Sequence, residues 1–134
     1  MAAQRVLIVD DEPDIRELLD ITLSRMGLDT YSAATLSEAQ SMVMEITPDL
    51  CLTDMKLPDG NGISLVEYIQ QDHSHIPVAM ITAHGSVETA ISALKAGAFD
   101  FISKPIELET LRNLVSTALQ LADDTSARNE ADDN

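Results

Sequence analysis

Positive charge, cysteine and aromatic side chains are all scarce in this sequence. Eight lysines and arginines stand against 23 aspartates and glutamates, which gives a formal net charge of −15. Because nucleic acids and anionic membranes are themselves negative, this balance argues against direct binding of the segment to either. We therefore expect any DNA contact to come from outside these residues.

The chain has a single cysteine, Cys51, and no long hydrophobic run at its start. Cys51 falls inside an apolar run that predicts a buried strand, and one cysteine cannot form an internal disulfide. The apolar run before Asp10 is too short for a signal peptide or a membrane span. These features favour a reducing, cytoplasmic location.

Tryptophan is absent, and tyrosine and phenylalanine occur twice each, so aliphatic side chains must form the core. The length of 134 residues fits one domain. Residues 1–121 show the hydrophobic periodicity of a folded domain. Residues 122–134 are polar, acidic and without periodicity, which predicts a frayed tail or the start of a linker.

Short apolar runs alternate with helical patterns along most of the chain. The runs predict strands at 5–10, 28–32, 50–54, 78–82 and 99–103. Helices are expected between successive strands and at 107–121, with ends marked by Pro13, Gly27, Thr35 and Gly97. Strands and helices in alternation pack economically as one α/β fold, a doubly wound five-stranded parallel sheet with helices on both faces.

The last two helices raise the question of which side faces the core. The fourth helix has apolar residues at helical spacing: Val87, Ala90, Ile91 and Leu94. In the last helix a core face is expected from Leu108, Leu111, Val115 and Ala118. Leu114 and Leu121 lie off that face. They are either ordinary exposed leucines or, with the alanine-rich fourth helix, a surface for a partner.

Polar residues follow four of the apolar runs. Asp10 and Asp11 follow the first, Asp54 ends the third, Thr82 ends the fourth, and Lys104 and Pro105 follow the fifth. Since the carboxyl ends of parallel strands share one edge of the sheet, where ligands bind in such folds, these side chains are expected to lie together. Taken singly, Asp10 and Asp11 could instead cap the helix at Pro13.

Clustered carboxylates repel one another unless a hard cation lies between them. Mg²⁺ is the expected ion, because it accepts an incomplete shell of protein oxygens such as Asp11, Asp54 and a loop carbonyl. Asp10 would act at a greater distance or through water. A carboxylate beside such an ion can attack phosphorus and form an acyl phosphate. Thr82 would hydrogen-bond one phosphoryl oxygen, and Lys104 would pair with another.

This combination of residues at successive strand ends resembles the receiver domain of two-component response regulators, over about residues 4–121. The resemblance implies a CheY-like, flavodoxin-like sheet of order 2-1-3-4-5. It implies that Asp54 accepts a phosphoryl group from a sensor histidine kinase, in a catalytic set completed by Thr82 and Lys104. It also implies Mg²⁺ held by Asp11, Asp54 and the backbone carbonyl of Lys56, with Asp10 nearby, and a cis peptide bond before Pro105.

Thr82 and Phe101 are the switch pair that the resemblance implies. The threonine hydroxyl moves toward the phosphoryl group, and the aromatic ring swings inward to fill the space. Phe101 stands where such domains commonly have tyrosine, so contacts of a tyrosine hydroxyl are not expected here. From the sequence alone, Phe101 is equally a core residue or the switch ring.

Three segments are similar to receivers of the NtrC group: LPDGNG at 57–62, TAHGS at 82–86 and AGAFDF at 96–101. Those receivers precede a sigma-54-activating ATPase and a helix-turn-helix domain. The resemblance therefore implies the receiver part of a transcription regulator whose output domain lies outside this chain. It further implies a homodimer, sensitive to phosphorylation, through the region from the fourth to the fifth helix.

Two other classes of protein share parts of this pattern. Phosphatases of the haloacid dehalogenase type use an aspartate nucleophile, but they place a second acid two residues later, where this sequence has Lys56. A flavodoxin-like cofactor binder would need an anion-binding loop after the first strand, where Asp10, Asp11 and Glu12 would repel phosphate. The sequence thus favours a signalling switch over an enzyme.

Overall fold

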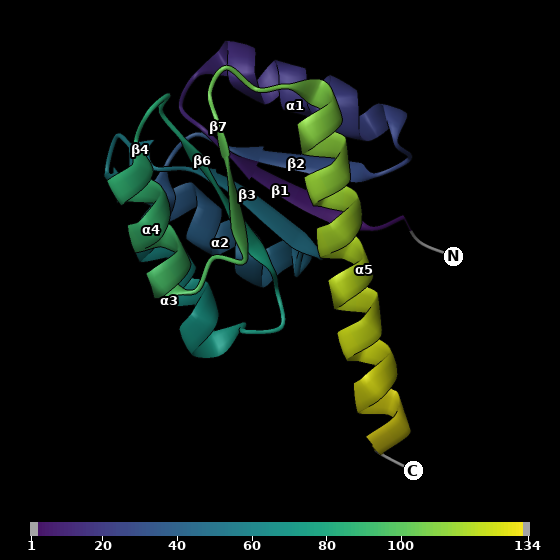
Figure 1. Ribbon diagram of the computed structural model, residues 1–134. Coiled ribbons are helices and arrows are strands. Elements are labelled where there is room, and N and C mark those ends of the chain that lie inside the picture. The colour runs from purple at the N-terminus through teal and green to yellow at the C-terminus, as the bar shows by residue number, and fades with distance from the viewer. Residues whose placement is uncertain (1–2, 133–134) are drawn as a thin grey trace.

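Five parallel strands form the centre of the molecule (Figure 1). The computed structural model describes residues 3–132, with side chains described for residues 3–120. The strands are β1 (Arg5–Val9), β2 (Asp29–Ala33), β3 (Leu50–Asp54), β6 (Val78–Thr82) and β7 (Asp100–Ser103). They lie in the order β2-β1-β3-β6-β7, and all neighbours are parallel. Because β6 and β7 are the fourth and fifth of these strands, the expected order is confirmed.

Helices cover both faces of the sheet (Figure 1). One face carries α1 (Pro13–Arg25) and α5 (Leu108–Asp132), and the other carries α2 (Leu36–Ile46), α3 (Gly62–Asp72) and α4 (Val87–Ala96). Strand β1 shows the division, since Val6 and Ile8 pack with α1 and α5 whereas Leu7 and Val9 pack with the other three helices. The doubly wound α/β class predicted from the sequence is therefore confirmed.

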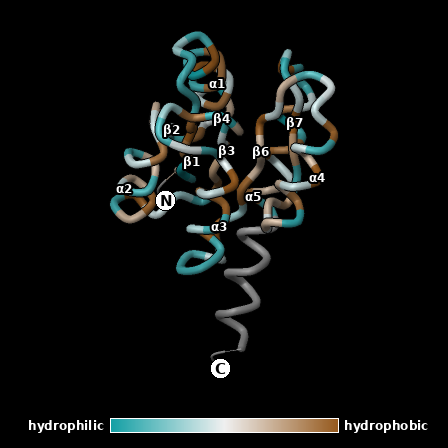
Figure 2. Tube along the Cα trace, turned by 90° about the vertical axis from the view of Figure 1, so that its left-hand side faces the viewer, coloured by the Kyte–Doolittle hydropathy of each residue, from teal (hydrophilic) through white to brown (hydrophobic). Residues whose placement is uncertain are grey.

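Aliphatic burial holds these layers together. Every residue of β3 and β6 is buried, as expected for strands that are covered on both faces. Each large aliphatic side chain contributes roughly 1.5–3 kcal/mol when it is fully buried. Figure 2 shows the hydrophobic positions concentrated along the central strands and the hydrophilic ones on outer turns and loops. Cys51 lies in this core, and burial raises the pKa of its thiol to about 12.

Helix α4 packs through small side chains. Ala90 and Ala93 are buried, whereas Val87, Ile91 and Leu94 are 68%, 46% and 41% exposed. The apolar spacing predicted the helix correctly, but the larger residues do not form its core face. Hydropathy does not distinguish a face that is covered by the sheet from an apolar face that is left open.

The core face of α5 also differs from the expectation. It consists of residues spaced for one helical stripe: Leu111, Leu114, Val115, Ala118 and Leu119. Leu114 is 6% exposed and Leu108 is 38% exposed, so the predicted positions of both were wrong. The reason is that Leu119 completes a stripe rotated by about one residue. The helix also continues past its predicted end at residue 121, and the side chain of Leu121 lies outside the described residues.

Side-chain hydrogen bonds cap the starts of α2 and α3 but not those of α1 and α4. The Thr35 hydroxyl accepts from the backbone N–H of Glu38 at 3.1 Å, as the predicted capping box requires. Helix α1 begins at Pro13 after Glu12, whose side chain makes no cap hydrogen bond. Of the two acids that could have capped it, Asp10 accepts the backbone N–H of Glu12, the residue before the helix, whereas Asp11 is not the N-cap residue. No helix in the described part of the chain is long and apolar enough to cross a membrane.

Candidate functional site

The carboxyl ends of β1, β3 and β7 bring charged side chains together. Asp10 directly follows β1, Asp54 ends β3, and Lys104 directly follows β7. The side chain of Asp10 is fully buried, and that of Asp54 is 10% exposed. The sheet fixes both positions, because the Asp10 N–H donates to the carbonyl of Ala33 and Asp54 is in register with Ile81. The grouping predicted from strand ends is therefore present for Asp10, Asp54 and Lys104, whereas the hydroxyl of Thr82 lies beside that of Ser103 instead.

The ammonium of Lys104 lies among three carboxylates. Its Nζ is 3.1 Å from Oε1 of Glu12, 3.3 Å from Oδ2 of Asp54 and 3.4 Å from Oδ2 of Asp10. Partial burial opposes the charged form, but the hydrogen bond to Glu12 and the charges of Asp10 and Asp54 outweigh it and raise the pKa of Lys104. The lysine is therefore charged at neutral pH. The peptide bond to Pro105 is cis, as the family resemblance implies.

Asp10 has an unusual environment for a carboxylate. Its Oδ1 accepts the backbone N–H of Glu12 at 2.8 Å, but its buried Oδ2 has no hydrogen-bond partner among the described residues. Burial raises the pKa of Asp10, and the negative charge of Asp54 adds to the rise, whereas the Glu12 N–H and Lys104 oppose it. An oxygen left in this condition is available to a ligand that brings positive charge.

Four acids at this edge form a set of oxygen donors suited to a hard cation. Asp10, Asp11, Glu12 and Asp54 each offer a carboxylate oxygen within 4.8 Å of the others. The set contains no nitrogen or sulfur donor, and it includes the buried Oδ2 of Asp10, which accepts no hydrogen bond among the described residues and has only Lys104, 3.4 Å away, as an ion-pair partner. It therefore fits an ion such as Mg²⁺. The sequence reasoning missed Glu12, although its place directly after Asp11 was a usable signal.

A hollow of about 350 Å³ opens over the acids. Asp11, Glu12, Asp54 and Lys104 line one part of it, and Met55 and Lys56 continue the wall from β3. Residues after β6 complete the lining: Ala83, Ser86 and Thr89. The Asp54 carboxylate is thus reachable from solvent through a space large enough for a small anionic group.

The loop after Asp54 is tied down at several points. It forms a small hairpin of β4 (Lys56–Leu57) and β5 (Gly60–Asn61), which the sequence did not predict. At its tip, the Asp59 carboxylate accepts the N–H groups of Leu36 and Ser37 at 2.7 and 3.0 Å, at the start of α2. These hydrogen bonds lower the pKa of Asp59. The loop carrying Lys56 is therefore anchored to a helix as well as to β3.

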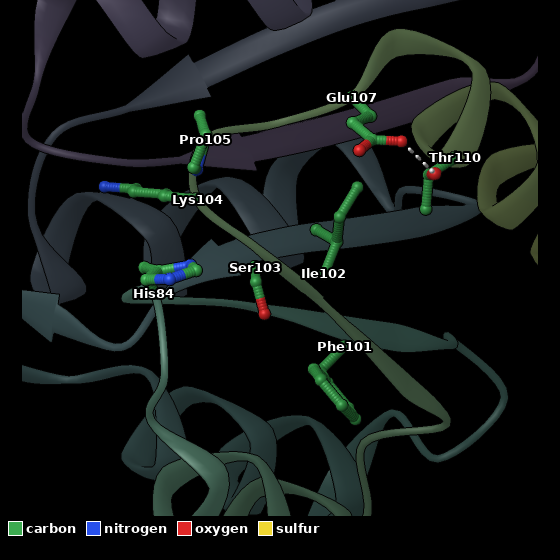
Figure 3. Close-up of a pocket in the computed structure, with 8 residues that line it drawn as sticks. All are labelled: His84, Phe101, Ile102, Ser103, Lys104, Pro105, Glu107 and Thr110. Atoms are coloured by element: carbon green, nitrogen blue, oxygen red, sulfur yellow. Dashed lines mark hydrogen bonds between the residues drawn. The ribbon is translucent and has the colours of Figure 1, made fainter.

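Thr82 and Phe101 lie on neighbouring strands but in different surroundings. Thr82 is 1% exposed, and its hydroxyl lies 3.4 Å from that of Ser103. Phe101 is 37% exposed, so it is not a core residue. It lines a second hollow, of about 470 Å³, together with His84, Ser103 and Pro105. Figure 3 shows the Phe101 ring and the Lys104 side chain at opposite ends of this hollow, with Lys104 extending away from the ring.

Comparison with known proteins gives consistent matches. The family model described as response regulator receiver domain matches residues 6–116. The response regulator protein PilR of Pseudomonas aeruginosa is 64% identical over 121 residues, which cover 90% of this chain and 27% of PilR. The chain spans about a quarter of the length of the curated relatives it matches.

Solved structures of receiver domains also resemble this chain. The receiver domain of NtrX from Brucella abortus is 38% identical with a TM-score of 0.82, covering 86% of this chain and 98% of that one. The beryllofluoride-activated NtrC4 receiver domain dimer is 35% identical with a TM-score of 0.83, covering 88% of this chain and 98% of that one.

Proposed function

The chain belongs to the response regulator receiver domain family, with NtrC-type relatives, and from this we propose that Asp54 is the phosphoacceptor of a signalling switch. The phosphoryl group would come from a sensor histidine kinase. One bond forms between a carboxylate oxygen of Asp54 and phosphorus, and the bond from phosphorus to the imidazole nitrogen of the kinase breaks. The imidazole nitrogen then recovers a proton.

One observation carries this proposal: Asp54 opens into a hollow beside a lysine ammonium and three other acids. The ammonium of Lys104, already 3.3 Å from Asp54, is placed to neutralise an oxygen of the incoming group. The hydroxyl of Thr82 would donate to a second oxygen. Asp54 thus supplies the nucleophile, and Lys104 and Thr82 stabilise the charge that it receives.

Asp10, Asp11, Asp54 and the backbone carbonyl of Lys56 would hold Mg²⁺ at this edge. When bound, the ion supplies screening of the charge between the carboxylates and the phosphoryl group. Asp10 contributes a buried carboxylate and Asp11 an exposed one, and the hairpin that carries Lys56 is anchored at its tip to the start of α2. The acids themselves exclude an anionic ligand until that charge is balanced.

Thr82 and Phe101 would couple the site to the outer surface. When the Thr82 hydroxyl turns toward a phosphoryl oxygen, it leaves its present neighbour, Ser103, and vacates space beside β7. Phe101 occupies the adjoining hollow and is exposed enough to rotate into that space. The bistable element is then the segment from β6 through α4 to Phe101.

The surface affected by such a change is apolar. Exposed large residues gather on α4, β7 and the start of α5: Val87, Ile91, Leu94, Phe101 and Leu108. We propose that a second copy of the chain covers them when Asp54 is phosphorylated, and that this dimer controls a transcription-activating output domain. The NtrC4 receiver, which is described as a dimer in its beryllofluoride-activated form, supports the idea by analogy. The setting would be the cytoplasm, and the domain would act as a switch rather than as an enzyme.

A small phosphodonor tests the phosphoacceptor directly. Acetyl phosphate with Mg²⁺ should add one phosphoryl group, detected by mass spectrometry as an adduct that is stable in acid and labile in base. The Asp54→Asn variant should remain unmodified, whereas Asp72→Asn, which removes an exposed acid at the end of α3, should react. An adduct on the Asp54→Asn variant, or none on the unaltered chain, would show that the proposal is wrong.

A further inference from the structure

Glu12 is the acid nearest to the Lys104 ammonium, although neither the composition nor the strand-end pattern singles it out. Its Oε1 lies 3.1 Å from Nζ and accepts a hydrogen bond, and the two residues are 92 positions apart in the sequence. Its side chain is 58% exposed, whereas the other two partners of Lys104 are buried or nearly so. Lys104 therefore bridges the interior of the site and its rim.

The backbone of Glu12 is held more firmly than its exposure suggests. Its N–H donates to Oδ1 of Asp10 at 2.8 Å, and its carbonyl accepts the N–H of Arg16 in the first turn of α1. The Arg16 guanidinium also donates to the backbone carbonyl of Asp10 at 2.7 Å. The carboxylate of Glu12 thus extends from a fixed point toward the hollow.

A cation bound among the inner acids would change the balance of forces on Lys104. The carboxylates of Asp10 and Asp54 would then interact mainly with the ion, and the ion itself would repel the ammonium. Although Glu12 belongs to the group of four acids, it is 58% exposed and already accepts a hydrogen bond from Lys104, so we expect its carboxylate to remain paired with the lysine rather than with the ion. Without such a partner the long lysine side chain gains rotamer freedom, and it must be ordered again before it can meet a phosphoryl group.

We propose that Glu12 is a positioning residue, which keeps the Lys104 ammonium at the mouth of the hollow while metal occupies the inner acids. The inference rests on the proposed phosphoacceptor role of Asp54. In this arrangement Lys104 approaches the incoming group from a prepared position, and Glu12 itself touches neither phosphorus nor the reacting oxygen.

The Glu12→Gln substitution separates positioning from simple charge. Removal of a negative charge alone would ease the approach of anionic acetyl phosphate and quicken the reaction. Loss of positioning would slow the phosphorylation of Asp54. Removal of an exposed ion pair of this kind changes an equilibrium or rate constant by about two- to fivefold. At saturating Mg²⁺ we therefore expect Glu12→Gln to be phosphorylated about two- to fivefold more slowly than the unaltered chain.

Two further variants make the comparison specific. In a Lys104→Gln background, Glu12→Gln should no longer slow the reaction, because the residue it positions is gone. Asp14→Asn removes the same charge from an exposed residue in the first turn of the same helix, and it should not slow the reaction. Unchanged or faster phosphorylation of Glu12→Gln would overturn the inference, and so would equal slowing in both backgrounds. Failure of the unaltered chain to react would instead contradict the role of Asp54.

A second measurement needs no phosphorylation. The chain has three lysines, so Cε signals in ¹³C-labelled protein can be assigned by substitution. When Mg²⁺ is added to the unaltered chain, the Cε chemical shift of Lys104 should stay distinct from that of the exposed Lys95. In Glu12→Gln, the Cε chemical shift of Lys104 should move toward that of Lys95. Equal behaviour of Lys104 in the two proteins would count against positioning by Glu12, whatever the kinetic result.

Discussion

Asp10 should weaken the metal-free fold, and its replacement by asparagine should strengthen that fold. The side chain is fully buried, and Oδ2 accepts no hydrogen bond among the described residues. Its ion-pair contact with Lys104 Nζ, at 3.4 Å, does not outweigh the cost of burial, because the pKa of Asp10 is still raised. An unsatisfied buried polar group costs about 1–3 kcal/mol. Asp10→Asn keeps the shape and removes the charge, while Lys104 retains Glu12 and Asp54 as partners. We expect the free energy of unfolding to rise by about 1–2 kcal/mol.

The rise in the free energy of unfolding caused by Asp10→Asn should depend on pH in a defined direction. The folded-state pKa of Asp10 is raised above the ordinary value of 3.8, so the folded protein holds the proton more tightly than the unfolded chain does. The contribution of protonated Asp10 to the free energy of unfolding is therefore lost as pH rises through that folded-state pKa. The advantage of Asp10→Asn should be absent below pH 3.8, grow through this window and remain constant at neutral pH.

Thermal and urea unfolding in the presence of a chelator would measure the difference, which corresponds to about 3–6 °C in Tm for a domain of this size. Asp11→Asn is the control, because it removes an exposed charge next to the same strand and should change stability by less than about 0.5 kcal/mol. With Mg²⁺ present, the unaltered protein should gain more stability than Asp10→Asn does. A less stable Asp10→Asn protein in chelator would refute the reasoning, because Asp10 would then be compensated by Lys104.

Three further predictions follow from packing and capping. Leu111→Ala removes a fully buried side chain from the core face of α5 and should lower the free energy of unfolding by about 2–5 kcal/mol in urea titrations, whereas a similar loss from Leu108→Ala would contradict the burial pattern. Ile91→Ala should leave the unfolding midpoint nearly unchanged but weaken self-association of the phosphorylated chain in analytical ultracentrifugation, and intact association would exclude α4 from the interface. Asp59→Ala should lower the midpoint at neutral pH, because two N–H groups of α2 lose their acceptor. Since the pKa of Asp59 is lowered in the folded state, that difference should shrink as pH falls below 3.8, and a constant difference would argue against the capping role.

The fold was predictable because its signals are local in the sequence. Alternating strand and helix patterns, with Gly27 and Gly97 just after two helices, were enough for a doubly wound sheet, and both glycines have positive φ angles of 84° and 125° in the structure. The site was predictable in part for a related reason. Asp10, Asp54 and Lys104 follow apolar runs, and parallel strands bring such positions to one edge.

Other features depend on contacts that the sequence does not reveal locally. The pairing of Glu12 with Lys104 arises only when β1 and β7 take their places in the sheet. The hairpin after Asp54 is stabilised at its tip by α2, a helix that precedes it in the chain. The core stripe of α5 was misplaced because Leu108 and Leu114 have the same hydropathy, and only the angle of the helix on the sheet separates them.

The way α4 meets the sheet has a mechanical consequence. A helix held by leucines that project into the core cannot slide without opening voids, since each large side chain occupies a fitted space. Helix α4 instead rests on the methyl groups of Ala90 and Ala93, which present a nearly smooth underside. A small translation or rotation would cost little packing energy there, because each buried methyl group contributes only about 0.8 kcal/mol. We therefore expect α4 to be displaced at a lower cost in packing energy than α1 or α3, which bury leucines against the sheet.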